Sequence, residues 1–260
     1  MSDDDVRQGD VSNVILASLP AAEFAELSPS LERVSFSTGE RFFDAEDAPR
    51  RIHFIESGLL SLISTLEDGT SIEVAALSRD GLCGLIVLLG AEAAVHTALA
   101  QIGGEALSLR TERAREAFRR LPAFQARVLA YTRMLMAHVT QTAACNTLHT
   151  VEQRLARWLL MCGRRLESDT LPLTQEFLSH MLGVRRSGVT VAVGILEREG
   201  LVTHSRGSIV IQDEECLRQV SCECIRVLTE EYEEFVNENL AVEKTRKESR
   251  SVQTLAGRGV

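Results

Sequence analysis

The sequence predicts an α+β protein with a strand-rich N-terminal domain, a long connecting helix and a compact C-terminal domain of helices and one hairpin. Three observations predict this class. Between about residues 31 and 110, short apolar runs alternate with polar residues and are separated by recurring glycines. From Thr111 the apolar spacing changes to steps of three and four, which is typical of helices. Residues 171–213 then combine two short helical patterns with a hairpin pattern.

The N-terminal domain, placed at residues 12–121, is predicted to be a small barrel or jelly roll, also called a double-stranded β-helix. It begins with a helical segment, "NVILASLPAAEFAEL". The stretch "IHFIESGLLSLISTLEDGTSIEVAAL" alternates in hydrophobicity and contains Asp68-Gly69, a strong hairpin signal. Regular spacing of short strands and turns is typical of such folds.

A long helix is predicted at residues 122–149. One stripe along it has steps of three and four, and it changes from apolar to small and polar residues halfway. The stripe consists of Val128, Thr132, Leu135, Val139, Thr142, Asn146 and His149. Such sustained steps favour a helix that pairs with its twin in a homodimer. The alternative is a helix that packs only on its own domain.

The C-terminal domain is placed at residues 150–237. It starts with the amphipathic stretch "TVEQRLARWLLMCGRRL", for which Thr150 is a suitable N-cap. Near its end, "LVTHSRGSIVIQD" predicts a two-stranded hairpin with Arg206 at the tip. The remaining residues, 238–260, are polar and lack aromatics, which predicts a disordered tail.

Between these elements lie two short helices joined by a sharp turn. Thr174 can cap the first helix, which runs through Leu182, and Gly183 can adopt the left-handed conformation of the turn. The second helix begins at Arg185 or Arg186. Its predicted buried face consists of Val189, Ala192, Val193 and Leu196, and its opposite face of Arg186, Ser187, Thr190 and Val191. This is helix-turn-helix geometry, and the hairpin that follows is a wing.

The charge distribution is compatible with a nucleic-acid partner despite a net charge of −9. The segment from Phe177 to Leu196 contains two arginines and no acid. Because salt screens charges more than about 10 Å away, a local basic face can still bind phosphate. There is no apolar run of membrane-spanning length, and the acidic N-terminus is unlike a signal or transit peptide. We therefore expect a cytoplasmic protein without a membrane partner.

The order of a β-rich domain, a long helix and "LTQEFLSHMLGVRRSGVTVAVGILEREGLVTHSRGSIVIQD" resembles the Crp/Fnr superfamily of bacterial transcription regulators. The resemblance covers about residues 12–235, and "IHFIESGLLSLI" adds to it. It implies a cyclic-nucleotide-binding-like sensor domain and a homodimer formed through the long helix. It also implies winged helices that read a palindromic operator in double-stranded DNA. RNA polymerase is a further candidate partner.

The recognition helix departs from the family pattern, which often places Arg, Glu and a second Arg at base-reading positions. Arg186 matches the first, whereas Ser187 stands in place of Glu and Val191 in place of the second Arg. Because Arg pairs bidentately with guanine, Arg186 is the best candidate for a base contact. The operator is therefore expected to differ from that of the best-known members.

Other DNA contacts are expected from side chains around this helix. Ser187 and Thr190 could read base edges or phosphate. Arg185, Thr174 and Arg206 are expected to contact the DNA backbone.

The candidate effector pocket is formed by Gly84, Leu85, His96 and Thr97. In the family, Gly-Glu binds the ribose and Arg-Ser or Arg-Thr binds the phosphate of a cyclic nucleotide. Here Leu85 replaces Glu, and His96-Thr97 replaces the Arg pair. Because each lost contact to a charge costs about 1.5–3 kcal/mol, we expect no control by cyclic AMP. A partly charged His96 would suit another anion; alternatively, aliphatic side chains fill the pocket.

The six cysteines are expected to be reduced thiols, with no metal or other cofactor. The first is Cys83, which argues against the N-terminal iron–sulfur cluster of oxygen-sensing relatives. Cys216, Cys222 and Cys224 fall on a predicted C-terminal helix, where residues two apart point to different sides. Such a CxC is a poor chelate unless the helix unwinds, so structural thiols are favoured over redox or metal sensing. Cys145 and Cys162 are interpreted as packing residues.

Catalysis is not indicated, because the chain has no Gly-rich phosphate loop, HExxH or GxSxG motif and no His/Glu metal cluster. The sequence therefore predicts a homodimeric, sequence-specific DNA-binding transcription regulator and not an enzyme. The alternative is an effector-sensing or interaction module whose degenerate helix-turn-helix does not read DNA specifically.

Overall fold

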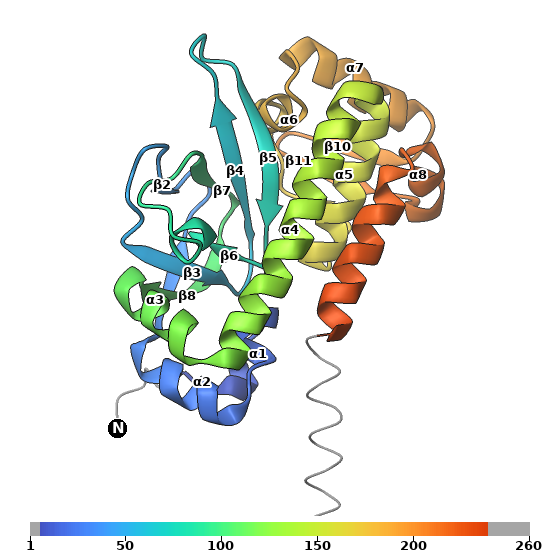
Figure 1. Cartoon of the computed structure of the whole chain (residues 1–260). Coiled ribbons are helices and arrows are strands. Elements are labelled where there is room, and N and C mark those ends of the chain that lie inside the picture. The colour runs from blue at the N-terminus through green and yellow to red at the C-terminus, as the bar shows by residue number, and fades with distance from the viewer. Residues whose placement is uncertain (1–5, 239–260) are drawn as a thin grey trace, which may run out of the picture.

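The computed structural model describes residues 6–238 of the chain. A β-rich domain lies on one side of the long helix α4 (Pro122–Leu148), and a mainly helical domain lies beyond its C-terminal half (Figure 1). No helix among the described residues is long and apolar enough to span a membrane. The predicted disorder of the tail falls, from residue 239 onward, outside the described residues.

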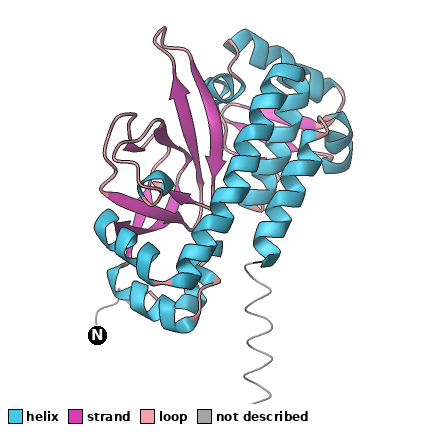
Figure 2. Cartoon of the chain, in the orientation of Figure 1, coloured by secondary structure: helices cyan, strands magenta, loops and turns pink. Residues whose placement is uncertain are grey.

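The N-terminal domain is an antiparallel β-sandwich of two four-stranded sheets (Figure 2). The sheet orders, β1-β8-β3-β6 and β2-β7-β4-β5, are those of a jelly roll. The strands are β1 (Glu32–Phe36), β2 (Arg41–Phe43), β3 (Arg51–Ile55), β4 (Leu59–Thr65), β5 (Ser71–Leu77), β6 (Leu82–Cys83), β7 (Thr97–Ile102) and β8 (Gly104–Arg110). The predicted hairpin at Asp68-Gly69 joins β4 to β5, and Gly69 has the positive φ of 83° that this turn requires.

Three short helices lie together at one end of the sandwich (Figure 1). They are α1 (Val14–Ala17), α2 (Ala21–Leu27) and α3 (Thr111–Arg120). Asn13 caps α1, and its amide group also donates to the carbonyl oxygens of Ile55 and Gly81. These bonds fix the N-terminal segment against the β-sandwich.

The long helix α4 buries one face against other parts of its own chain. Its buried residues are Phe124, Val128, Tyr131, Met134, His138 and Cys145. Most of the predicted stripe is only half-buried and lies along the edge of that face. The exposed large apolar side chains of α4 are Leu129, Met136, Val139 and Leu148, with exposed fractions of 49%, 66%, 38% and 76%. Because the stripe is predicted to pair with a second copy of the helix, its partial burial within one chain leaves the homodimer a prediction.

The C-terminal domain has its own core around Trp158 and Leu178. Its elements are α5 (Val151–Leu166), β9 (Thr170–Leu171), α6 (Gln175–Leu182), α7 (Arg186–Arg198), β10 (Val202–Ser205), β11 (Ser208–Ile211) and α8 (Glu214–Val220). Thr150 and Gln153 form a capping box at the start of α5. The predicted N-cap at Thr150 is thereby confirmed.

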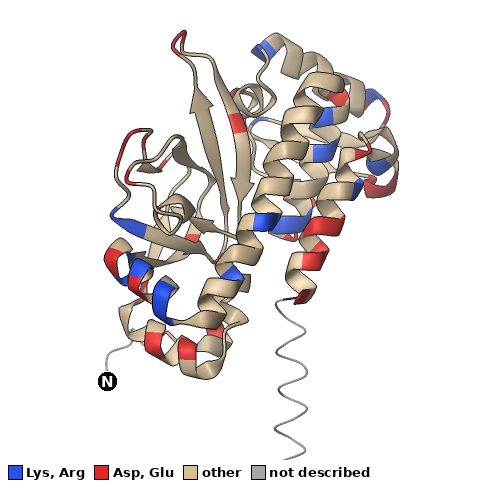
Figure 3. Cartoon of the chain, viewed as in Figure 1, with Lys and Arg blue, Asp and Glu red and all other residues tan. Residues whose placement is uncertain are grey.

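A last helix, described over residues 224–238, returns along α4 (Figure 1). Acidic positions on this helix lie beside basic positions on α4 and α5 (Figure 3), and ion pairs join them. Arg133 pairs with Glu234 and Glu238, and Arg164 pairs with Glu233. The last described helix is therefore held against α4 and α5 by ion pairs.

Candidate nucleic-acid interface

The turn between α6 and α7 is built by local hydrogen bonds. The Thr174 hydroxyl oxygen accepts a 3.1 Å bond from the amide of Phe177, which caps α6. At the other end, Gly183 has a φ of 62°, and its amide donates to the carbonyl of His180. The Arg154 guanidinium on α5 also donates to the carbonyl of Leu182, at the end of α6. The turn is therefore held from both inside and outside the motif.

The two faces of α7 separate as the sequence predicts. Val189, Ala192, Val193 and Leu196 are buried. Arg185, Arg186, Ser187, Thr190 and Val191 are all exposed, and none of them is an acid. Helix α7 therefore presents a convex, acid-free surface of the width that a major groove accepts.

Arg186 has a partner that sequence reasoning did not foresee. Its Nη2 atom lies 3.0 Å from Oε2 of Glu176 on α6, and both side chains are largely exposed. Exposed ion pairs stabilise a fold by only about 0–1 kcal/mol. A DNA base can therefore compete with Glu176 for this guanidinium.

The wing lies beside the N-terminus of α6. Strands β10 and β11 pair antiparallel, and the turn between them contains Arg206 and Gly207, whose φ is 85°. Thr174 and Arg206 line one open groove. The structure thus brings Thr174 together with the wing, whereas Arg185 and Arg186 lie at the start of α7.

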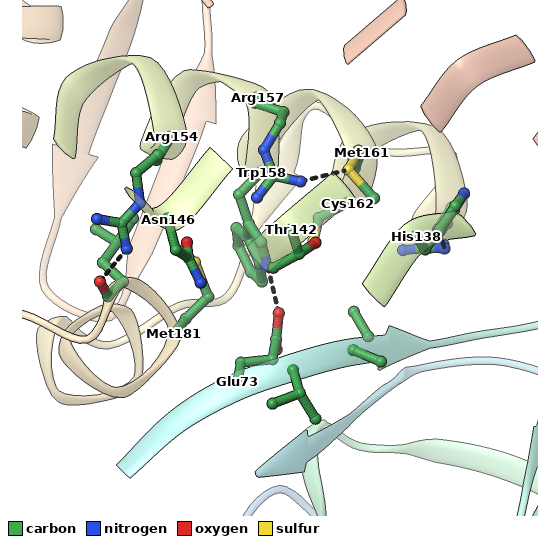
Figure 4. A pocket seen from close by; sticks show the side chains of 15 residues that line it. Glu73, His138, Thr142, Asn146, Arg154, Arg157, Trp158, Met161, Cys162 and Met181 are labelled. Carbon is green, nitrogen blue, oxygen red and sulfur yellow. Dashed lines mark hydrogen bonds between the residues drawn. The ribbon is translucent and has the colours of Figure 1, made fainter. Parts of the chain in front are cut away.

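The helix-turn-helix also contacts the β4–β5 hairpin of the N-terminal domain. A Cβ atom added to Gly183 would lie 2.9 Å from Ile72 on β5, so the turn approaches this strand closely. Nearby, the indole nitrogen of Trp158 donates a 2.9 Å hydrogen bond to Glu73 (Figure 4). Burial raises the pKa of the Glu73 carboxyl, against the hydrogen bonds from Ser61 and Trp158, which lower it. The two domains therefore share a buried polar contact.

A second buried contact between the domains lies at Arg165 of α5. Its guanidinium lies 3.1 Å from a carboxylate oxygen of Asp80, and both side chains are almost completely buried. Arg165 also donates to Nδ1 of His138 on α4, at 3.2 Å, and Nε2 of His138 lies 3.2 Å from the carbonyl of Leu228. Burial, with the positive charge of Arg165, lowers the pKa of His138 to about 4. The imidazole is therefore neutral and accepts from Arg165 while donating to Leu228.

The predicted effector-pocket residues occupy the edge of the β-sandwich. Gly84 has a φ of 91° and packs on Ile52, and Leu85 is buried in the core. The Thr97 hydroxyl donates to Asp44, whose carboxylate also pairs with Arg41 at 2.5 Å, so an ion pair lies beside this position. Burial lowers the pKa of His96, and its Nδ1 atom is buried without a hydrogen-bond partner among the described residues. The expectation of a partly charged His96 is therefore not supported.

Comparison with known proteins identifies both domains. The profile of the Crp-like helix-turn-helix domain matches residues 153–220, and the profile of the cyclic nucleotide-binding domain matches residues 33–121. The nitrogen fixation regulation protein FixK of Bradyrhizobium diazoefficiens is 25% identical over 213 residues, which are 78% of this chain and 87% of FixK.

The chain belongs to the Crp/Fnr family of DNA-binding transcription regulators. The predicted resemblance and the predicted fold class are thereby confirmed. Members of this family are transcription regulators rather than enzymes.

Solved Crp/Fnr structures share the fold. FixK2 of Bradyrhizobium japonicum has a TM-score of 0.65 at 17% identity, covering 74% of this chain and 98% of FixK2. CLP of Xanthomonas campestris, described as responsive to c-di-GMP, has a TM-score of 0.62 at 16% identity, covering 75% of this chain and all of CLP. A putative cAMP-binding regulator of Silicibacter pomeroyi has a TM-score of 0.56 at 23% identity, covering 82% of this chain and 97% of that protein.

Sequence reasoning missed the residues that join the two domains of this Crp/Fnr protein. Glu73 and Trp158 are 85 positions apart, as are Asp80 and Arg165. The signal in the sequence is the presence of acids and arginines within apolar stretches. The sequence does not show which acid contacts which partner.

Proposed function

We propose that this regulator acts as a cytoplasmic homodimer that binds a palindromic operator, and that cyclic AMP does not control it. The observation that carries the proposal is the exposed, acid-free face of α7 beside the wing. Hydrogen-bond donors and small side chains on that face match the edges of bases in a major groove.

Each exposed residue of the interface has a proposed role. Arg186 leaves Glu176 and forms a bidentate contact with guanine. The Thr190 hydroxyl donates to the carbonyl of Arg186 at 3.0 Å, so its methyl group, with Val191, faces outward. These methyl groups would contact the C5-methyl group of thymine, and Ser187 would contact a base edge.

Contacts to the DNA backbone are proposed around these base-reading residues. Arg185 and Arg206 are placed to bind phosphates at the start of α7 and at the wing. The Thr174 hydroxyl oxygen accepts the capping bond, so its proton remains available for a phosphate oxygen. Contacts of this kind fix the register of the protein on the duplex but do not distinguish sequences.

The exposed apolar residues of α4 support the homodimer. Leu129, Met136 and Val139 follow one another at steps of seven and three, and their side chains are between 38% and 66% exposed. A heptad-like apolar stripe is the pattern by which two helices pair. A second copy of α4 would cover these side chains.

The absence of cyclic AMP control is supported by the chemistry of the candidate pocket. Leu85 cannot accept hydrogen bonds from ribose hydroxyls, and Asp44 lies beside the position proposed for the phosphate. The nearby Arg41 guanidinium already pairs with Asp44 at 2.5 Å, so its charge is offset by the carboxylate and is not free for a phosphate. The effector, if the protein has one, would therefore have different chemistry.

The decisive experiment is selection from random DNA duplexes with the purified protein. We expect enrichment of a palindrome whose half-sites lie about one helical turn, ~34 Å, apart. Affinity for the selected site should fall steeply with salt, because phosphate contacts release counterions. Selection without enrichment would support the alternative, an interaction module whose helix-turn-helix does not read DNA.

The same operator tests the remaining parts of the proposal. Cyclic AMP at millimolar concentration should change neither operator affinity nor melting temperature; a large rise in either would contradict the argument about the pocket. Transcription in vitro from a promoter that carries the operator would show whether RNA polymerase is recruited or blocked.

A further inference from the structure

Four side chains from distant parts of the sequence meet where α4 ends. They are Cys145, His149, Cys222 and Cys224, and one potential ligand atom of each lies within 4.8 Å of all the others. The Sγ atoms of Cys145 and Cys222 are 3.4 Å apart, and Sγ of Cys224 lies 3.6 Å from Nδ1 of His149. All three cysteines are buried, and His149 is partly exposed at the edge of the cluster.

The backbone presents these side chains without strain. Cys145 and His149 are four residues apart at the end of α4, so they lie on the same face of its last turn. Helix α8 ends at Val220, and the next helix begins at residue 224. The interruption removes the objection to a CxC chelate within a continuous helix. Cys222 and Cys224 therefore both reach the cluster.

The distances fit a single four-coordinate ion. With bonds of about 2.3 Å to sulfur and about 2.0–2.1 Å to nitrogen, the ligand atoms of a tetrahedral Zn²⁺ site lie about 3.3–3.8 Å apart. The Cys224–His149 distance of 3.6 Å matches a sulfur and a nitrogen ligand, and the Cys145–Cys222 distance of 3.4 Å is slightly shorter than the roughly 3.8 Å expected for two sulfur ligands. A multi-iron cluster would need to push the four side chains farther apart.

Neighbouring groups would favour the histidine tautomer and the sulfur orientation that metal binding requires. Nε2 of His149 lies 3.2 Å from a carboxylate oxygen of Glu223, which favours the tautomer with a free Nδ1. The Gln141 amide donates a 3.0 Å hydrogen bond to Sγ of Cys224. A carboxylate behind a histidine ligand and an N–H group on a sulfur ligand are typical of the surroundings of protein metal sites.

Two buried arginines supply the compensating charge. Three thiolates and one imidazole around a divalent cation leave a net negative charge. Arg154 and Arg157 on α5 are buried, and their Nε atoms have no hydrogen-bond partner among the described residues.

We propose that Cys145, His149, Cys222 and Cys224 bind one thiolate-preferring divalent cation, for which Zn²⁺ has the best geometry. The ion would join the end of α4, the start of α5 and the segment after α8. It would therefore fix the joint between the long helix and the DNA-binding domain.

The first test is the metal content of the full-length protein, purified without an affinity tag and under reducing conditions. We expect about one Zn²⁺ per chain, and replacement by Co²⁺ should give the intense visible absorption of tetrahedral cobalt thiolates. Zn²⁺ should also slow hydrogen exchange around residues 145–150 and 221–225. Folded protein that contains no metal and gives no cobalt spectrum would overturn the proposal.

Variants separate a ligand set from a cluster that only packs. Cys222→Ser and His149→Ala should lose the ion, whereas His149→Cys, which retains a ligand, should keep it. Cys216→Ser is the matched control, because Cys216 lies outside the cluster, and it should keep full metal content. Equal metal loss in Cys216→Ser would contradict the assignment.

Two substitutions keep all four ligands and so remain informative if ligand variants fail to fold. Gln141→Ala and Glu223→Ala should each weaken Zn²⁺ affinity about 10–100-fold. Unchanged affinity in both would overturn the proposed surroundings of the site. Iron with acid-labile sulfide, or a Cys145–Cys222 disulfide trapped directly from cells, would show that the cluster serves other chemistry.

Discussion

Trp158 on α5 donates a 2.9 Å hydrogen bond from its indole nitrogen to Glu73 on β5. Both side chains are buried, and Ser61 donates to the second carboxylate oxygen. The DNA-binding domain is thus fastened to the hairpin of the sensor-like domain at a carboxylate that water cannot reach. If the DNA-binding domain moves relative to the β-sandwich, either this hydrogen bond breaks or the β4–β5 hairpin moves with the domain.

Trp158→Phe should therefore destabilise the protein by about 1–3 kcal/mol, because it leaves a buried acceptor without a donor. Phenylalanine keeps one aromatic ring but is smaller than indole, so the loss combines the hydrogen bond with a packing contribution. Urea unfolding measures the difference. Phe177→Leu, which alters the ring contact of Phe177 with Trp158 but keeps the N–H group, is the comparison. If Trp158→Phe changes nothing, the bond does not hold the domains together.

The neutral state of His138 predicts a loss of stability in acid. Its folded pKa of about 4 lies below the usual value of 6.5, so the unfolded chain takes up the proton first. The stability it contributes is complete above pH 6.5 and is lost as pH falls toward 4. Between pH 7 and 5 this loss should be about 2 kcal/mol.

His138→Gln isolates this effect, because an amide can still accept from Arg165 and donate to Leu228 without titrating. Its stability should depend less on pH in that window, by the same about 2 kcal/mol. Glu73, with its raised pKa, acts in the opposite direction in both proteins and cancels in the comparison. His180→Gln, at an exposed position, is the control. Identical pH dependence in wild type and His138→Gln would contradict a neutral buried imidazole.

Met136→Glu combined with Val139→Glu should convert the dimer into monomers, because it places charges on the face proposed to pair. Light scattering after size-exclusion chromatography measures the mass. Val95→Glu, a substitution at a side chain that is 70% exposed on the β-domain, should leave the dimer intact. A double variant that stays dimeric would place the interface elsewhere.

Arg186→Ala and Arg206→Ala should weaken DNA binding in different ways. Loss of a guanine contact costs about 1–3 kcal/mol and relaxes preference at one position of each half-site. Loss of a phosphate contact weakens all sequences alike and reduces the salt slope by about 1 per binding subunit. Titrations against the selected operator and a scrambled duplex distinguish the two. A uniform loss in Arg186→Ala would make it a backbone contact.

Glu176→Gln tests the ion pair that holds Arg186 in the free protein. Without the competing carboxylate, operator affinity should rise slightly, by no more than about 1 kcal/mol, since both side chains are exposed. Competition titrations measure the change. A fall in affinity would mean that Glu176 positions Arg186 for DNA.

Much of the fold could be predicted because its signals are local. The buried quartet of α7, the cap at Thr174 and the turn at Gly183 depend on residues within one or two helical turns. The same holds for the hairpin at Asp68-Gly69. Such patterns express backbone preferences that a short segment already has.

Predictions failed where packing partners decide. The sequence does not say which face of α4 packs within the chain, and the buried face includes Tyr131, Met134 and His138, which lie outside the predicted stripe. The predicted helix around Cys222 and Cys224 is interrupted, and Cys145, interpreted as a packing residue, belongs to their cluster. These features depend on contacts between segments about 75 or more positions apart.

The sequence by itself determined the jelly roll, the long helix and the winged helix-turn-helix, since hydrophobic period, caps and turn residues act over a few positions. Only the tertiary structure decided how the parts are fastened. It buried Glu73 beneath Trp158, paired Asp80 with Arg165 and gathered three cysteines and a histidine at one joint. Removing charged and sulfur-containing groups from water is favourable only when partners are present, and folding brings those partners from distant parts of the chain.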